Sequence, residues 1–427
     1  MNTIINPARS QWQDICVRPS DDNPVVRERV EKIIARVKAG GDKALNELAQ
    51  EIDGFVPESI EVSEEAIRTA SASIDDSLKE AIAAAAANIR AFHEAQMPKA
   101  IEVMTAAGVR CIQKPVAIGK VGLYIPGGTA PLFSTVLMLA IPAKIAGCGE
   151  IILCTPAGKD GKIAPAVLYA ASYCGVDRIF QVGGSQAIAA MAFGTESIPK
   201  VDKIFGPGNQ YVTTAKQMLG GKAVAIDMPA GPSEVMVIVD GSSNPAYAAA
   251  DLLSQAEHGI DSQVILISTS EDMISKVEEE LQKQLAVLPR HEIAEKTLEN
   301  SQFVLVKDKE EAMALSNAYA PEHLIIATDD YEVLAEKVIN AGSVFLGNYA
   351  CESAGDYASG TNHTLPTHGY ALAYNGVNLD SYNRKVTFQH LSEEGIRSIG
   401  KAVVCMAENE MLEAHANAMR VRVNDVK

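Results

Sequence analysis

Short apolar runs alternate with helix-like stretches over most of the chain. From about residue 116, "VAIGKVGLYIP" is followed by "PLFSTVLMLAIPAKIAGC", and the same order repeats through "EIILCTP", "DRIFQVGG" and "VDKIFGPG". A second series runs from "SEVMVIVD" to "SVFLG". This alternation is typical of parallel βα units. The pattern therefore predicts two α/β units in succession.

The two ends of the chain follow other patterns. In the first part of the chain, "DDNPVVRERVEKIIARVKAGGDKALNELAQEID", with a break at Gly40 and Gly41, and "EEAIRTASASIDDSLKEAIAAAAANIRAFHEAQ" have apolar positions at helical spacing, which predicts helices there. From about residue 376 onward the chain is predicted to be helical, with apolar residues on one face and no sheet of its own. We expect this tail to dock on another surface, such as a second subunit.

Composition excludes several classes of protein. The 427 residues, 47% hydrophobic and 21% charged, are typical of a globular protein with several domains. A net charge of -17 with scattered Lys and Arg residues predicts no nucleic-acid partner. The first residues lack an export signal, and no apolar stretch is long enough to span a membrane, so we expect a soluble cytoplasmic protein. The seven cysteines lie far apart, which favours reduced thiols.

The segment "YAPEHLII" places Glu322 and His323 directly before an apolar run. Neighbouring side chains of a regular strand point to opposite faces, so the two can share a pocket only where the backbone is irregular. Pro321 disfavours helical backbone at Ala320, which predicts such an irregular turn. The alternative is an ordinary polar start to a buried strand.

In "LLSQAEHGIDSQ", Gln255 and His258 are three positions apart at a predicted helix end and so lie on one face. This spacing suits two ligands of one metal ion, although a glutamine oxygen is an unusual zinc ligand. The alternative is a helix end in which His258 faces the dipole and Gly259 forms the cap.

A glycine-rich stretch, "GNYACESAGDYASGTNHTLPTHG", contains Asp356, His363 and His368. Loop residues of this kind often form sites, but any turn-rich connection has a similar composition. His415 lies in a predicted amphipathic helix, where a histidine is most often solvated or packed.

The segment "VDKIFGPGNQYVTTAKQ" predicts a strand, a glycine turn and a helix, which is the context for a phosphate at a helix N-terminus. Gly206 and Gly208 match the first two glycines of a dinucleotide fingerprint, but Tyr211 stands where the third is expected. An ordinary turn before a helix has the same composition, so both interpretations stay open.

Several long segments together closely resemble histidinol dehydrogenase, in family order and over nearly the whole chain. They are "YIPGGTAPLFSTVLMLAIPAKIAGC", "VGGSQAIAA", "KIFGPGNQYVTTAKQ", "DMPAGPSEVMVI", "DLLSQAEHGIDSQVIL", "APEHL", "AGSVFLGNYACESAGDYASGTNHTLPT" and "YNGVNLDSYNRKVTFQ". The resemblance implies an α/β fold of two Rossmann-like parallel α/β domains, with a helical C-terminal tail exchanged across a homodimer.

We accordingly divide the chain into four parts. Residues 1–22 are an N-terminal segment, 23–122 and 233–375 form a discontinuous first α/β domain with the metal and substrate site, 123–232 form a second α/β domain on the NAD side, and 376–427 form a dimerisation tail.

The family oxidises L-histidinol through L-histidinaldehyde to L-histidine with two NAD+, the last two steps of histidine biosynthesis, and depends on zinc. By resemblance, the metal ligands are Gln255, His258, Asp356 and His415. The expected substrate contacts are these four residues together with Ser233, His323, His363 and Glu410. The expected NAD contacts are Tyr124, Gln186 and Asn209.

The two oxidation steps expected from the resemblance match the side chains at these positions. Histidinol offers imidazole and amine nitrogens to a zinc ion with mixed nitrogen and oxygen ligands, so the metal anchors and orients it. Alcohol oxidation requires a base for the hydroxyl proton, for which we expect His323. Aldehyde oxidation first requires addition of water, for which we expect Glu322 as the base.

Glu410 and His415 are five positions apart and so point about 140° apart on a helix. The family resolves this by extending the tail into the neighbouring subunit's site. Two other classes of function remain: a zinc hydrolase in which Glu322 activates a metal-bound water, and a noncatalytic binding protein with the same fold. NAD reduction by histidinol would separate them from a dehydrogenase.

Overall fold

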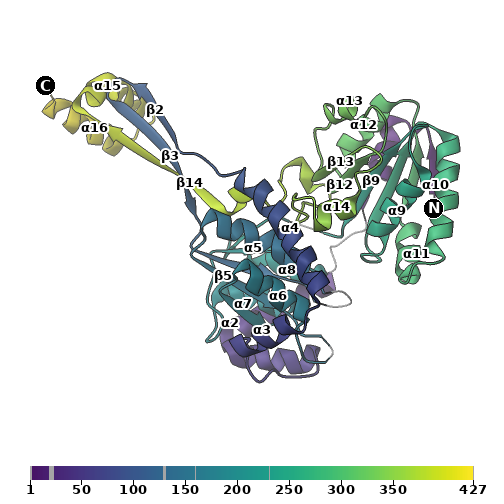
Figure 1. The fold of residues 1–427 in the computed structure, drawn as a ribbon. Coiled ribbons are helices and arrows are strands. Elements are labelled where there is room, and N and C mark those ends of the chain that lie inside the picture. The colour runs from purple at the N-terminus through teal and green to yellow at the C-terminus, as the bar shows by residue number, and fades with distance from the viewer. Residues whose placement is uncertain (1, 19–23, 128–130, 159, 230, 427) are drawn as a thin grey trace.

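The computed structural model describes residues 2–18, 24–127, 131–158, 160–229 and 231–426, which form two α/β domains and a projecting arm (Figure 1). One domain contains a parallel five-stranded sheet of order β6-β5-β4-β7-β8. Its strands are β4 (Lys120–Tyr124), β5 (Glu150–Thr155), β6 (Arg178–Gln181), β7 (Lys203–Phe205) and β8 (Ala225–Ile226). Its helices are α5 (Phe133–Ala146), α6 (Pro165–Cys174), α7 (Gly184–Phe193) and α8 (Gln210–Leu219). The strand order reverses between β4 and β7, where parallel sheets form a ligand crevice.

Three N-terminal helices complete this domain: α2 (Pro24–Ile52), α3 (Glu64–Ala72) and α4 (Asp76–Glu94). Helix α2 packs on α7 and α8, α3 on α6, and α4 on α5. The assignment of residues 23–122 to the same domain as 233–375 is therefore wrong. Apolar side chains such as Val30 and Ile33 share a core with Ile188, and hydrophobic periodicity does not reveal which core a helix covers.

The other domain contains a parallel six-stranded sheet of order β1-β11-β10-β9-β12-β13. Its strands are β1 (Asn2–Ile5), β9 (Glu234–Val239), β10 (Gln263–Ser268), β11 (Gln302–Leu305), β12 (His323–Ile326) and β13 (Ser343–Leu346). Its helices are η1 (Arg9–Gln11), α1 (Trp12–Ile15), α9 (Pro245–Ala256), α10 (Glu271–Leu285), α11 (His291–Glu299), α12 (Lys309–Tyr319), α13 (Tyr331–Ala335) and α14 (Glu352–Tyr357). The prediction of two parallel α/β units is confirmed, and the N-terminal segment adds the edge strand β1.

The arm is a three-stranded antiparallel sheet of order β14-β3-β2 that carries two helices at its end (Figure 1). Its elements are β2 (Ile101–Ala106), β3 (Val109–Ala117), β14 (Asn383–Leu391), α15 (Glu393–Asn409) and α16 (Glu413–Asp425). Two short turns, η2 (Tyr370–Leu372) and η3 (Leu379–Tyr382), precede β14. The tail is therefore not helical throughout, because β14 pairs along its whole length with β3, which is distant in sequence.

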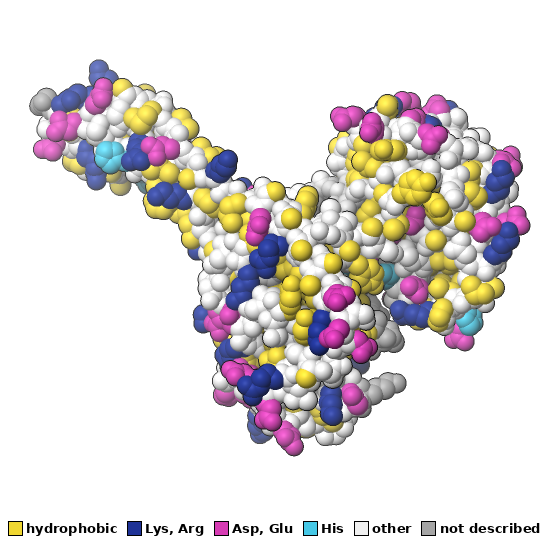
Figure 2. All heavy atoms as spheres, in the orientation of Figure 1, with side chains coloured by type: hydrophobic (Ala, Val, Ile, Leu, Met, Phe, Trp, Pro, Cys, Tyr) yellow, Lys and Arg dark blue, Asp and Glu magenta, His cyan; other side chains and the backbone are white. Residues whose placement is uncertain are grey.

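The surface of the arm differs from tip to base. Figure 2 shows charged side chains at the tip and apolar side chains along the strands. Ile101, Val103 and Phe388 are each about half exposed on the sheet. No helix of the described part of the chain has the length and hydrophobicity that a membrane span requires.

Candidate active site

A cavity of about 410 Å³ lies between the two α/β domains and is lined by residues of both. From the five-stranded domain come the glycine turn after β7 and the start of α8. From the six-stranded domain come residues at the amino ends of β9 and β12 and beside α9 and α14. Among the lining side chains are Asn209, Ser233, Gln255, His258, Glu322, His323, Glu352, Asp356 and His363.

The turn between α12 and β12 brings Glu322 and His323 into this cavity together. Helix α12 ends at Tyr319, and the backbone of the next residue, Ala320, is left-handed with φ 53° and ψ 67°. The Glu234 N–H donates a hydrogen bond of 2.8 Å to Glu322 Oε2, and the Glu234 carbonyl oxygen lies 3.2 Å from His323 Nδ1. Glu322 Oε2 and His323 Nδ1 are 3.7 Å apart. The predicted irregular turn is confirmed.

Burial controls the protonation of this pair. Burial raises the pKa of Glu322 to about 8. Burial alone would lower the pKa of His323, but the carboxylates of Glu352, Glu322 and Asp356 together raise it to about 10. A cation bound among these carboxylates would offset their charge and so reduce the second effect. A carboxyl group that titrates near neutral pH can both release and accept a proton.

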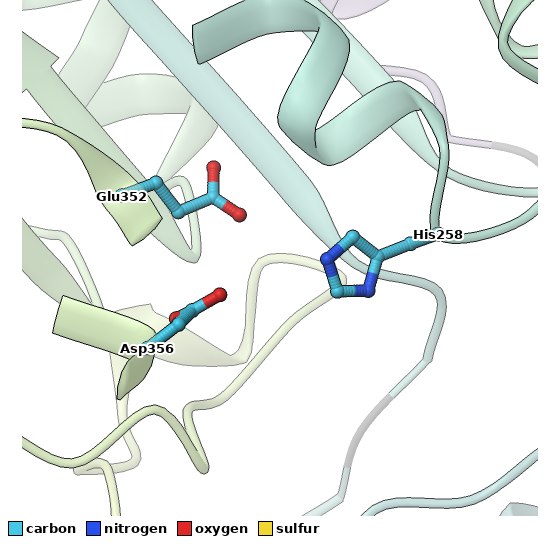
Figure 3. A group of neighbouring side chains, drawn as sticks. All are labelled: His258, Glu352 and Asp356. Atoms are coloured by element: carbon cyan, nitrogen blue, oxygen red, sulfur yellow. The ribbon is translucent and has the colours of Figure 1, made fainter. Parts of the chain in front are cut away.

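His258, Glu352 and Asp356 form a cluster suited to a metal ion. Their potential ligand atoms all lie within 4.8 Å of one another. Figure 3 shows the two carboxylates pointing from the same helix toward the His258 ring. Glu352 and Asp356 are four positions apart on α14, which places them on one face.

Gln255 lies in the last turn of α9, three positions before His258, and is fully buried. Its amide oxygen and nitrogen, and also Glu352 Oε2, have no hydrogen-bond partner within the described chain. Buried polar atoms without partners are rare and costly, so these atoms fit a site that an ion and its bound ligands would complete. Nitrogen and oxygen donors of this kind suit zinc.

Gln255, His258 and Asp356 thus lie at one cavity, whereas sequence analysis missed Glu352. The spacing of Glu352 four positions before Asp356 was the available indication, but α14 has only six residues and gave no helical periodicity.

His415 and Glu410 lie on the arm, away from the cavity of their own chain. His415 is on α16 and borders a surface hollow beside α15, together with Val403 and Met419. Glu410 follows the end of α15. A single chain therefore brings together three of the four expected metal ligands.

The expected substrate contacts Ser233 and His363 both line the cavity. His363 Nε2 lies 3.2 Å from Thr135 Oγ1, and His363 Nδ1 lies 2.8 Å from the Asp356 carbonyl oxygen. Burial lowers the pKa of His363, which favours its neutral form. His368 does not line the cavity, and its backbone N–H donates to Glu234 Oε1.

The three expected NAD contacts are not at one surface. Asn209 caps α8 and lines the cavity. Tyr124 is buried at the end of β4, where its hydroxyl oxygen accepts a hydrogen bond of 3.0 Å from the Gly184 N–H, and burial raises its pKa to about 12. Gln186 is buried in α7 and borders a separate small hollow.

The glycine turn after β7 is fixed from two sides. Gly206 has φ 123°, and a Cβ atom there would lie 2.1 Å from the Tyr124 carbonyl oxygen, so only glycine fits. Lys216 Nζ donates to the Gly206 carbonyl oxygen at 2.7 Å and lies 2.6 Å from Asp227 Oδ1. Asp227 Oδ2 accepts from the Gly206 N–H at 2.8 Å. The turn presents the N-terminus of α8 to the cavity.

Comparisons with known proteins agree with this geometry. The sequence profile of the family described as histidinol dehydrogenase matches residues 16–423. The chain is 58% identical to histidinol dehydrogenase of Bacteroides thetaiotaomicron over 427 residues, all of both chains. It is 49% identical to histidinol dehydrogenase of Escherichia coli K12 over 432 residues, covering 100% of this chain and 99% of the other.

A crystal structure of histidinol dehydrogenase from Elizabethkingia anophelis has the same fold. The TM-score is 0.97 at 50% sequence identity, covering 100% of this chain and 98% of the other. With a family match over nearly its full length and relatives of this similarity, the chain belongs to the histidinol dehydrogenase family, the oxidoreductases that catalyse the final steps of histidine biosynthesis.

Proposed function

We propose that this chain oxidises L-histidinol to L-histidine through L-histidinaldehyde, with two NAD+ and one zinc ion per subunit. The observation that carries the proposal is the single cavity that joins Glu322 and His323 to Gln255, His258 and Asp356. The same cavity reaches the strand-order reversal of the five-stranded sheet, where a dinucleotide is expected.

Gln255, His258, Asp356 and the partner subunit's His415 would hold the zinc. When bound, the ion supplies a Lewis acid that anchors the imidazole and amine nitrogens of histidinol. Glu352 adds negative charge beside this site, with Oε1 4.0 Å from His323 Nδ1. Its carboxylate can accept a hydrogen bond from an N–H group of the amine, which binds the ion through the lone pair of its neutral form.

His323 acts as the base of the alcohol oxidation. Its Nδ1 faces the Glu234 carbonyl oxygen, which accepts hydrogen bonds only, so Nδ1 carries the ring proton. Nε2 would then take the hydroxyl proton, and NAD+, when bound, would supply the hydride acceptor. Nε2 is buried, lies 3.7 Å from Asp356 Oδ1 and makes no hydrogen bond within the described residues, which supports this role once an ion holds Asp356.

Glu322 acts in the second half-reaction. The aldehyde has no hydroxyl proton, so water must add before the second hydride can leave. Glu322 Oε2 is held by the Glu234 N–H, and Oε1 is the atom that would take the proton of the water. With a pKa of about 8, the carboxyl group can accept this proton and release it afterwards.

The cofactor would lie along the glycine turn and the N-terminus of α8. Asn209 is the residue of the expected NAD set that faces the cavity. Tyr124 and Gln186 would support the cofactor site without facing the cavity. The Tyr124 hydroxyl accepts a hydrogen bond from the Gly184 N–H at the start of α7. The Lys216–Asp227 pair would keep the turn in the shape that the cofactor requires.

The arm would pair two chains so that each active site is shared. Apolar side chains line a hollow of about 420 Å³ on the open face of its sheet, including Ile101, Val103 and Phe388. A second copy that covered this face would bury them. The same exchange would carry the partner subunit's His415 and the partner subunit's Glu410 to the cavity.

The test is formation of NADH from histidinol by the purified protein, before and after treatment with a chelator and then with zinc. We expect activity that the chelator removes and zinc restores. Hydrolysis of an ester or amide without NADH formation would support the zinc hydrolase instead and refute this proposal.

A further inference from the structure

A buried arginine–glutamate pair contacts the turn between α12 and β12 that carries Glu322 and His323. Arg18 Nε lies 2.5 Å from Glu234 Oε1, and Arg18 Nη2 lies 3.1 Å from Glu234 Oε2, so the two side chains meet in a forked arrangement. The Arg18 side chain is 10% exposed and the Glu234 side chain 3%. Arg18 belongs to the N-terminal segment, more than 300 residues from the turn that it touches.

Arg18 also fixes the end of α12. Its Nη2 donates to the Tyr319 carbonyl oxygen at 2.6 Å and lies 3.5 Å from the Ala320 carbonyl oxygen. Its guanidinium carbon lies 3.9 Å from the centre of the Tyr319 ring. A cation at a helix C-terminus is favourable, and here it offsets the partial negative charge of the carbonyl groups at the point where the chain turns toward Glu322.

Glu234 connects this guanidinium to both catalytic side chains. Its backbone N–H holds Glu322 Oε2, and its carbonyl oxygen lies beside His323 Nδ1. Its side chain also accepts from the His368 N–H at 2.8 Å. A shift of Glu234 would therefore move the carboxylate of Glu322 and the ring of His323 at the same time.

The burial of this ion pair indicates that it fixes the positions of nearby groups more than it stabilises the fold. Removing two charges from water costs several kcal/mol, which their mutual attraction seldom exceeds, so a buried ion pair adds little net stability. The planar fork of arginine does fix the orientation of its carboxylate. We propose that Arg18 and Glu234 are positioning residues that set the geometry of Glu322 and His323. This inference rests on the proposed function, which gives that pair its catalytic role.

The chain offers a control with the same contacts in Arg178 and Glu61, whose side chains are more exposed, at 34% and 39%. Arg178 makes the same forked contact, with Nε 2.8 Å from Glu61 Oε1 and Nη2 2.7 Å from Glu61 Oε2. Arg178 also donates to a backbone carbonyl and lies over an aromatic ring. It does not line the active-site cavity.

The experiment compares Arg18→Lys, Arg18→Ala and Arg178→Ala in the full-length holoenzyme. Lysine keeps the charge but loses the fork, so we expect Arg18→Lys to lower kcat for NADH formation about 10-fold and Arg18→Ala about 100-fold, the scale of a catalytic group displaced by about 1 Å. The KM for NAD+ should change less than 3-fold. Arg178→Ala should leave kcat within 2-fold of the parent.

Rescue separates positioning from folding. Millimolar guanidinium ion should restore kcat of Arg18→Ala at least 5-fold and should not affect Arg178→Ala. A normal kcat for the folded fraction of Arg18→Ala, with only a lower thermal midpoint, would overturn the inference. Glu322→Gln and His323→Asn are measured alongside. If these two retain full activity, the proposed function fails; if they are slowed while Arg18→Lys and Arg18→Ala match the parent, only the present inference fails.

Discussion

Glu322→Gln is the sharpest test of how the two half-reactions are divided. Glutamine has the shape of glutamate, and its amide oxygen can still accept the 2.8 Å hydrogen bond from the Glu234 N–H, so the fold and the turn should be unchanged. The variant lacks only a carboxylate that can take a proton. Loss of a general base costs about 10²- to 10⁴-fold in rate, or ~3–5 kcal/mol in the barrier. We expect that loss in aldehyde oxidation and less than about 10-fold in alcohol oxidation.

The assay measures each half-reaction by itself. Stopped-flow NADH absorbance is followed with histidinol as the substrate and, separately, with histidinaldehyde. It is run at pH 9, because the pKa of Glu322 is about 8 and the carboxylate then exceeds the acid about 10-fold. A bound cation would lower the pKa of Glu322, so the Glu322 carboxylate of the parent enzyme would stay ionised at pH 9. Equal loss in both half-reactions would refute the division of roles. His323→Asn is the comparison, and it should slow both.

Four further expectations follow from the same geometry. His258→Ala should lower the zinc content after dialysis, measured by elemental analysis, and histidinol should no longer protect the protein from thermal unfolding. Lys216→Met should raise the KM for NAD+ about 10-fold while the KM for histidinol stays within 2-fold, because the glycine turn loses one of its two supports. Hybrids of a His415→Ala chain with a His323→Asn chain should recover about a quarter of the parent activity after random mixing, since each hybrid regains one intact shared site; no recovery would contradict the shared site. A chain ending at residue 391 should stay folded by circular dichroism but lose activity.

A chain that ends near residue 376, where the tail was predicted to begin, is expected to bind zinc weakly and lose activity because it lacks the tail. It also lacks a buried part of the five-stranded domain. Tyr382 is fully buried, its ring lies 4.1 Å from that of Phe205 between centres, and its hydroxyl donates to the Leu139 carbonyl oxygen at 2.9 Å. Removal of a buried aromatic side chain costs about 3–5 kcal/mol. The sequence boundary at 376 thus cuts into the core of the five-stranded domain.

Local patterns predicted what depends on neighbouring residues. The alternation of apolar runs with helices predicted both parallel sheets. The three-residue spacing singled out Gln255 and His258, which both line the cavity, although α9 ends at Ala256, before His258. Pairing across the sequence was not predictable in this way. Strand β14 pairs with β3, more than 260 residues earlier, and local periodicity does not indicate so distant a partner. The contacts of Arg18 were not predictable from neighbouring residues, because its partners, Glu234 and Tyr319, are distant in the chain.

Two buried ion pairs among the described residues lie beside the two turns that border the cavity. Among the Lys and Arg ion pairs between described residues, only Arg18–Glu234 and Lys216–Asp227 have both side chains at most 10% exposed. One holds the turn that presents Glu322 and His323, and the other holds the glycine turn at Gly206. Both turns have left-handed or otherwise unusual backbone, which costs free energy unless neighbouring groups fix it. Under the proposed function, in which hydride passes from the substrate to NAD+, a buried ion pair beside each turn would hold the two turns of opposite domains in a fixed arrangement.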